Sequence, residues 1–178
     1  GTIVRKSVAT GYLLKINGDP ANYGTPNPQG YGTVMVPENT WITNTVGTPA
    51  NEGAGQRWSC IGYVVTNAIG TEVASGSGTQ AVFQMTEPLF LVWRWTNEFY
   101  LMATANVGGS LLMDKTGWYT NGTPVALTAV PGAAHNFLQW SGSGVPAPQR
   151  FETTLNLVMD RARTVQANFA TNTPMTRT

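Results

Sequence analysis

Two stretches 74 residues apart share one strand pattern, and this duplication constrains the fold more than any other feature of the chain. When Met85 is placed on Met159, alternate positions before and after both methionines are apolar in each stretch. The pairs are Ala81 with Leu155, Phe83 with Leu157, Leu91 with Val165, Trp93 with Ala167 and Trp95 with Phe169. Alternate side chains of a β-strand lie on one face. The pattern therefore predicts two strands with one buried face in each stretch.

The starts of the two copies can be matched in the same way. Tyr12 of "YLLKI" is placed on Tyr100 of "YLMAT", an offset of 88 residues. The interval from this tyrosine to the methionine is then 14 residues longer in the first copy than in the second. Insertions in turns cost little free energy. We expect the extra residues in the Gly-rich segments 47–56 and 67–78.

The remaining pattern is typical of an all-β protein. Apolar residues seldom recur at helical spacing, and 20 Gly and 11 Pro interrupt most windows. Short alternating or β-branched runs lie between turn-rich segments. We predict two tandem small antiparallel β modules, either β-grasp-like without a clear helix or Ig-like small sandwiches. The first would span residues 1–98, with 1–10 as a strand of a preceding repeat. The second would span 99–170, before a flexible tail at 171–178.

The repeated pattern also predicts the core of each module. Trp95 and Trp140 stand where the other copy has an aromatic residue, which favours a buried role over a ligand-binding one. The residues expected in the cores are Phe83, Met85, Leu91, Trp93, Trp95, Phe137, Trp140, Leu155, Leu157, Met159, Val165 and Phe169.

Charge and cysteine content argue against several partners. Charged residues make up 11% of the 178 residues, against roughly 25% in typical globular domains. The net charge is +1 and the basic residues are scattered, so a nucleic-acid surface is not expected. No apolar run is long enough to insert in a membrane. The single cysteine, Cys60, cannot form an internal disulfide or a cysteine-rich metal site.

The reactive side chains do not form a catalytic pattern. The one histidine, His135, has no acidic neighbour in the sequence, and we expect it in a turn or at a strand edge. Cys60 lies in a strand-like run and is expected to pack as a small hydrophobic residue. The nine acidic residues are dispersed, and "NGDPAN" (17–22) is typical of an Asx turn. We therefore expect no enzyme activity, no metal and no cofactor.

Residues 100–170 carry a family resemblance. The segments "GWYTNGTPVALTAVPGAAHNFLQWSGSG" (117–144) and "TLNLVMDRARTVQANF" (154–169) contain its elements. These are Gly122-Thr123 before a valine strand, Phe137 and Trp140 followed by Gly142, and Met159 before Ala167-Asn168-Phe169. In these elements the chain resembles the divergent internalin B-repeat family of bacterial surface proteins, and residues 12–95 match it less well. The resemblance implies β-grasp-like modules in extracellular or cell-envelope arrays.

Two functions follow from the resemblance and from the aromatic content. The first is a non-catalytic spacer, structural or adhesion element of a larger bacterial surface protein. The alternative is a module that binds a cell-surface protein or a glycan through exposed aromatic rings. Trp41 and Trp118 lie next to turns and are the candidates for ligand contact.

Overall fold

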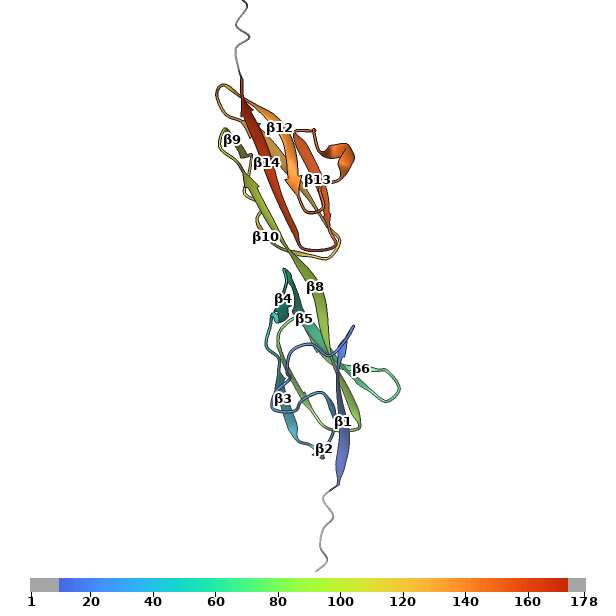
Figure 1. Cartoon of the computed structure of the whole chain (residues 1–178). Coiled ribbons are helices and arrows are strands. Elements are labelled where there is room, and N and C mark those ends of the chain that lie inside the picture. Colours follow the sequence, from blue (N-terminus) through green and yellow to red (C-terminus); the bar gives the residue numbers. More distant parts are fainter. Residues whose placement is uncertain (1–9, 173–178) are drawn as a thin grey trace, which may run out of the picture. The chain divides into compact units, whose positions relative to one another are not determined.

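The regular secondary structure of the described residues is all β-strand apart from one short 3-10 turn. A computed structural model describes residues 10–172 (Figure 1). These residues form two compact units. The first comprises the residues up to Asn51 together with Trp58–Thr96. The second comprises Glu52–Arg57 together with the residues from Asn97 onward. The all-β prediction is confirmed.

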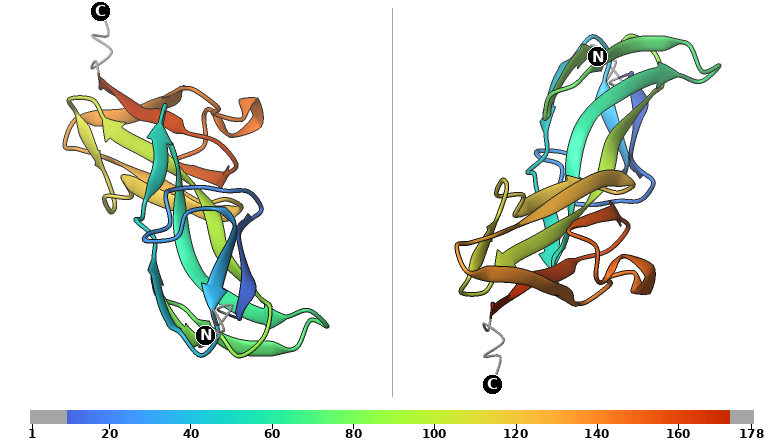
Figure 2. Two further views of the ribbon diagram at one scale, coloured as in Figure 1. Left: turned by 90° about the horizontal axis from the view of Figure 1, so that it is seen from below. Right: turned by 90° about the horizontal axis from the view of Figure 1, so that it is seen from above.

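The first unit is built around two parallel neighbouring strands. β1 (Gly11–Asp19) pairs in parallel with the first half of β8 (Leu89–Ala105), from Leu14 opposite Leu89 onward. On its other edge β1 pairs antiparallel with β2 (Gly32–Pro37). Figure 2 shows β1 and β8 side by side from two further directions. The first and last strands of the unit are therefore hydrogen-bonded neighbours.

A second layer closes the core of this unit. β3 (Trp41–Thr45) and β7 (Gln80–Gln84) form a two-stranded antiparallel sheet. Three further strands extend the main sheet: β4 (Ala50–Gly53), β5 (Gln56–Asn67) and β6 (Glu72–Gly76). β4 and β6 lie in segments 47–56 and 67–78, where the extra residues of the first copy were expected, and β5 connects these segments. Apolar side chains of both layers meet in one cluster. Its members include Phe83, Met85, Leu91, Trp93 and Trp95, all buried.

The second unit repeats the parallel arrangement. The second half of β8 pairs in parallel with β14 (Arg163–Thr171), from Leu101 opposite Arg163 to Ala105 opposite Ala167. β12 (His135–Gly142) pairs antiparallel with β14, and β10 (Gly117–Thr120) pairs antiparallel with β8. Thr171 ends β14. Residues 173–178 of the expected tail and residues 1–9 of the expected preceding strand lie outside the described residues.

The facing layer of the second unit has three strands. β11 (Thr123–Pro131) lies between β13 (Thr154–Met159) and β9 (Gly109–Leu111), and the 3-10 turn η1 (Ala147–Gln149) precedes β13. Of the core residues expected here, six are buried: Trp140, Leu155, Leu157, Met159, Val165 and Phe169. Phe137 is half-buried, with its ring centroid 5.6 Å from that of Trp140. Each unit is thus a two-layer β fold with no α-helix among its described residues.

The strand registers correct one alignment made from sequence. The parallel ladders begin at Leu14 opposite Leu89 in the first unit and at Leu101 opposite Arg163 in the second. Leu14 and Leu101 are both fully buried. Leu14 therefore matches Leu101, at an offset of 87, and the match of Tyr12 with Tyr100 is wrong by one residue. A slip of one residue exchanges the buried and exposed faces of a strand.

Two buried polar side chains have defined partners. Asn44 donates through Nδ2 to the carbonyl oxygen of Gln29 at 2.8 Å, and its Oδ1 accepts from the Trp93 indole at 3.3 Å. Arg163 donates to the Gly144 carbonyl oxygen at 2.6 Å and to Asp160 at 2.7 Å. Buried polar groups are retained when such bonds offset their desolvation. Neither residue belongs to the apolar pattern, so sequence periodicity did not indicate them.

Candidate functional site

Trp41 lies at the mouth of a shallow apolar groove on the first unit. Its side chain is 66% exposed at the first position of β3, opposite Gln84 of β7. The groove has a volume of about 320 Å³ and is also lined by Val73, Ala74, Val82, Phe83 and Thr86. Val73 and Val82 are themselves exposed. The sequence prediction for Trp41 thus coincides with an apolar surface that is open to solvent.

Trp118 lies in a more enclosed setting in the second unit. It stands on β10 opposite Tyr100, and the two ring centroids are 5.2 Å apart at 62°. The Arg57 guanidinium lies 4.3 Å from the Trp118 ring centroid. Arg57 also forms a salt bridge of 2.7 Å with Glu98. A ring in cation–π contact with an arginine has one face covered. Trp118 therefore offers less surface to a ligand than Trp41 does.

Arg57 belongs to a short segment, residues 52–57, that is bonded to the second unit. Tyr100 donates its backbone N–H to the Gly55 carbonyl oxygen at 2.8 Å, and Gln56 donates to the Asn97 side chain at 3.1 Å. Gly55 has φ +74°, and a Cβ there would lie 2.6 Å from the Cβ of Ala162. Only glycine satisfies both restrictions without strain. This segment, distant in sequence, was not expected to join the second unit.

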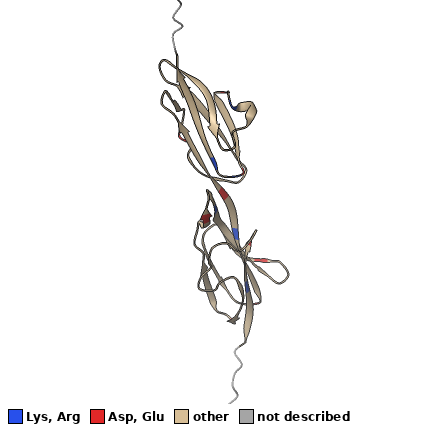
Figure 3. Cartoon of the chain, in the orientation of Figure 1, with Lys and Arg blue, Asp and Glu red and all other residues tan. Residues whose placement is uncertain are grey.

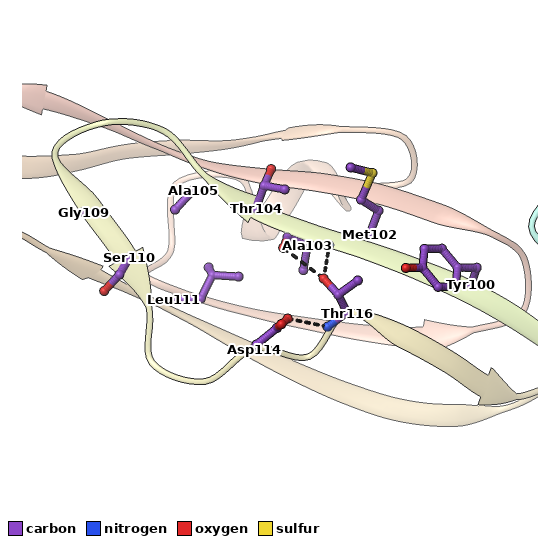
Figure 4. A pocket seen from close by; sticks show the side chains of 10 residues that line it. All are labelled: Tyr100, Met102, Ala103, Thr104, Ala105, Gly109, Ser110, Leu111, Asp114 and Thr116. Carbon is purple, nitrogen blue, oxygen red and sulfur yellow. Dashed lines mark hydrogen bonds between the residues drawn. The ribbon is translucent and has the colours of Figure 1, made fainter.

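A second groove follows the edge of β8 in the second unit (Figure 4). Its volume is about 520 Å³. It is lined on one side by Tyr100 and residues 102–105, and on the other by residues 109–111, Asp114 and Thr116. Asp114 is the one charged residue in this lining, and its Oδ1 accepts the Thr116 N–H at 2.8 Å. Sequence reasoning did not indicate this groove, although both of its walls lie within residues 100–116.

Charged side chains are sparse on both units. Figure 3 shows Lys and Arg, and Asp and Glu, as isolated positions along the strands. Within residues 10–172 no group of three or more His, Cys, Asp or Glu side chains is placed to hold a metal ion. Among the same residues there is no helix long and apolar enough to span a membrane.

The cysteine and the histidine lie in separate units. Cys60 is half-buried in the first unit, and burial raises the pKa of its thiol. A raised pKa lowers the fraction of reactive thiolate at neutral pH. His135 is in the second unit at the start of β12, with Nδ1 2.8 Å from the Ala133 carbonyl oxygen. The "NGDPAN" segment places the Asn22 side chain as acceptor for the Gly18 N–H at 2.7 Å, as in a local turn.

Comparison with known protein families gives a match for the second unit. Residues 99–173 match the family model described as the divergent InlB B-repeat domain. Over this range the chain is similar to that family. The matched range covers the second half of β8 and every later strand, and it confirms the resemblance seen in residues 100–170. The B-repeat family suggests a repeat module of surface or extracellular proteins.

No curated protein and no solved structure matches the chain. The family match over residues 99–173 is therefore the one similarity found. The matched range of the B-repeat begins at residue 99 and does not include residues 52–57, which the structure places in the same compact unit.

Proposed function

We propose that the chain is a non-catalytic, load-bearing repeat segment of a larger bacterial surface protein. The B-repeat match of the second unit supports the surface setting. The sparse charge and the separated reactive side chains are consistent with a structural role. In this role the segment acts as a spacer that transmits tension without unfolding.

The observation that carries this proposal is the parallel pairing of first and last strands. In the second unit five consecutive residue pairs join β8 to β14, from Leu101–Arg163 to Ala105–Ala167. Tension applied through the two ends of the unit pulls these parallel strands past one another. The whole ladder then resists at once, because its hydrogen bonds lie across the direction of sliding. The first unit has the same geometry between β1 and β8.

We also propose that the first unit is a second, divergent copy of the B-repeat. Matching hydrogen bonds support this relation. The Asn39 N–H donates to the Met85 carbonyl oxygen at 2.7 Å, and the Gly122 N–H donates to the Met159 carbonyl oxygen at 2.8 Å. Asn39 and Gly122 both have positive φ, 62° and 86°. The two methionines are the pair from which the sequence repeat was recognised.

Single-molecule force spectroscopy tests the load-bearing role. The chain is pulled from its two ends in one experiment, which loads both parallel pairs in shear. In a second experiment it is pulled through cysteines introduced by His135→Cys and Thr171→Cys, with Cys60→Ala removing the native thiol. These two positions are paired at one end of the antiparallel β12–β14 ladder, so force there opens one residue pair at a time.

The end-pulled chain is expected to rupture at a clearly higher force than the chain pulled through positions 135 and 171, at the same loading rate. Forced unfolding is governed by the unfolding barrier and not by equilibrium stability. Equal rupture forces in the two geometries would contradict the load-bearing role. Thermal unfolding of the cysteine variants, measured alongside, verifies that the substitutions leave the fold intact.

A second candidate function is recognition of a cell-surface protein or a glycan through Trp41. The observation that favours it is the 66% exposed indole beside the 320 Å³ groove. Flat aromatic faces bind apolar surfaces while polar groups at their rim give specificity. Gln84 and Thr86 supply such polar groups at this groove.

A glycan array, followed by titration of tryptophan fluorescence, tests this candidate. Saturable binding is expected to disappear in Trp41→Ala and to persist in Trp118→Ala, because an arginine covers the Trp118 ring. Loss of binding in both variants, or in neither, would exclude Trp41 as the contact.

A further inference from the structure

The edge of β8 in the second unit is only partly covered by its neighbouring strand. β10 pairs with residues 98–101 and no further. Beyond them, the Thr116 hydroxyl takes the place of a strand partner. It accepts the Ala103 N–H at 3.1 Å and donates to the Ala103 carbonyl oxygen at 3.2 Å. Figure 4 shows this side chain reaching across the groove to β8.

Ala105 presents its backbone groups to the same open edge. Successive residues of a strand direct their N–H and C=O groups to opposite edges. The Asn106 N–H donates to the Ala167 carbonyl oxygen of β14 at 3.0 Å. The backbone N–H and C=O groups of even-numbered residues in this part of β8 therefore point toward β14, and those of odd-numbered residues point toward the groove. Unpaired edge groups of this kind are templates for an added strand. The groove therefore offers backbone hydrogen-bonding groups along its wall.

The first unit shows what occupies the corresponding edge. Leu14 and Leu101 begin the two parallel ladders, so Ile16 of β1 corresponds to Ala103 of β8. In the first unit β2 continues along this edge, with Gly32 opposite Ile16. An extended segment of the chain thus fills the edge in one unit, and the other unit has a groove of about 520 Å³ in its place.

We propose that this groove binds an extended peptide segment of a partner protein as an added strand beside Ala103–Ala105. The peptide would run antiparallel to β8 and continue the line of β10. Main-chain hydrogen bonds supply affinity in such strand addition, and alternate side chains supply specificity. This site goes beyond the spacer function and does not depend on it.

The lining of the groove defines the chemistry of the peptide. Leu111 and the methyl groups of the two alanines form its inner wall, so the inward side chain is small and aliphatic. Met102, which is 48% exposed, and Thr104 flank the outer side. Asp114 is the one charge in the lining and favours a basic residue near one end of the peptide. The occupant is therefore a β-branched segment flanked by Lys or Arg.

The probe is the capped peptide Ac-Lys-Thr-Val-Thr-Val-Thr-Lys-NH2, titrated into the ¹⁵N-labelled chain and followed by NMR. Saturable shift changes are expected at Ala103 and Ala105, with smaller changes on β12. Two further versions of the peptide are N-methylated, one on both valines and one on the central threonine. Because alternate residues face the β8 edge, one version is expected to bind at least about tenfold more weakly and the other to bind as before.

Two variants of the chain sharpen the test. Asp114→Lys is expected to weaken peptide binding about threefold or more, whereas Glu152→Lys, an exposed acid outside the groove lining, leaves it unchanged. Thr116→Val removes the hydroxyl that competes for Ala103 and is expected to tighten binding about three- to tenfold.

Three results with the peptide probes and the chain variants would overturn the proposal. They are no shift change at residues 103–105, equal binding of the two N-methylated peptides, and equal effects of Asp114→Lys and Glu152→Lys. Binding of a soluble oligosaccharide at these same residues, with no peptide binding, would assign the groove to another ligand and also overturn it. The N-methylated pair uses the unmodified chain, so the test stands even where a variant folds poorly.

Discussion

Replacing Leu101 by alanine tests the strand register from which the second unit is built. Leu101 is fully buried and begins the parallel ladder with β14, whereas its neighbour Met102 is 48% exposed. Both substitutions to alanine remove three heavy atoms. At about 0.8 kcal/mol for each buried CH₂, Leu101→Ala loses about 2.4 kcal/mol of transfer free energy. The cavity it leaves raises the cost to about 3–4 kcal/mol. Met102→Ala is expected to cost less than about 1 kcal/mol.

Hydrogen exchange of backbone amides, followed by mass spectrometry, measures this difference within the second unit. Peptides from β11 and β13 report on its opening. A loss of about 3 kcal/mol corresponds to exchange faster by about a hundredfold or more, since each 1.4 kcal/mol is tenfold. Met102→Ala is expected to change exchange by about fivefold at most. If Met102→Ala proves the more damaging, the register deduced from the buried leucines is wrong and the original tyrosine alignment is right.

Three further predictions concern single positions. Asn39→Gly is expected to raise the free energy of unfolding by about 0.5 kcal/mol, because φ is +62° there and glycine occupies the matching position 122; a loss of stability in urea titration would contradict this. Asn44→Ala removes the acceptor of the buried Trp93 indole and is expected to cost about 1–3 kcal/mol, measured by the same titration, with an unchanged midpoint as the opposing result. Cys60 is expected to react with iodoacetamide more slowly in the folded chain than in urea, with a rate that rises at higher pH, because burial raises its thiol pKa; equal rates in both states would exclude this protection.

The apolar pattern of the closing strands was readable from the sequence because it depends on residues two apart. Phe83 and Met85 in the first unit, and Leu157 and Met159 in the second, are buried as alternation predicts. The opening strands were less clear. In "YLMAT" three successive residues are apolar, so alternation does not fix which face is buried, and matching the letters of two tyrosines moved the register by one residue.

The residues that sequence reasoning missed depend on contacts between distant segments. Arg163 appears as part of a charged turn, yet it is buried against Gly144 and Asp160. In the sequence Thr116 is indistinguishable from other threonines in turns, and only the folded structure shows that its hydroxyl bonds to Ala103 of β8. The sequence places Trp118 and Trp41 alike beside turns. Arg57, 61 residues before Trp118 in the chain, distinguishes them by covering the Trp118 ring. No local pattern reports such pairings.

Residues 52–57 have a consequence for how this chain can be cut and recombined. In sequence they lie between the two segments of the first unit, at the end of β4 and the start of β5, but they belong to the second compact unit. There Gly55 accepts the Tyr100 N–H, and Arg57 pairs with Glu98. A gene fragment beginning at residue 99 would encode the whole range that matches the family and still omit these partners. The residues that the family match would select and the residues that make up the folded unit are therefore different sets in this protein.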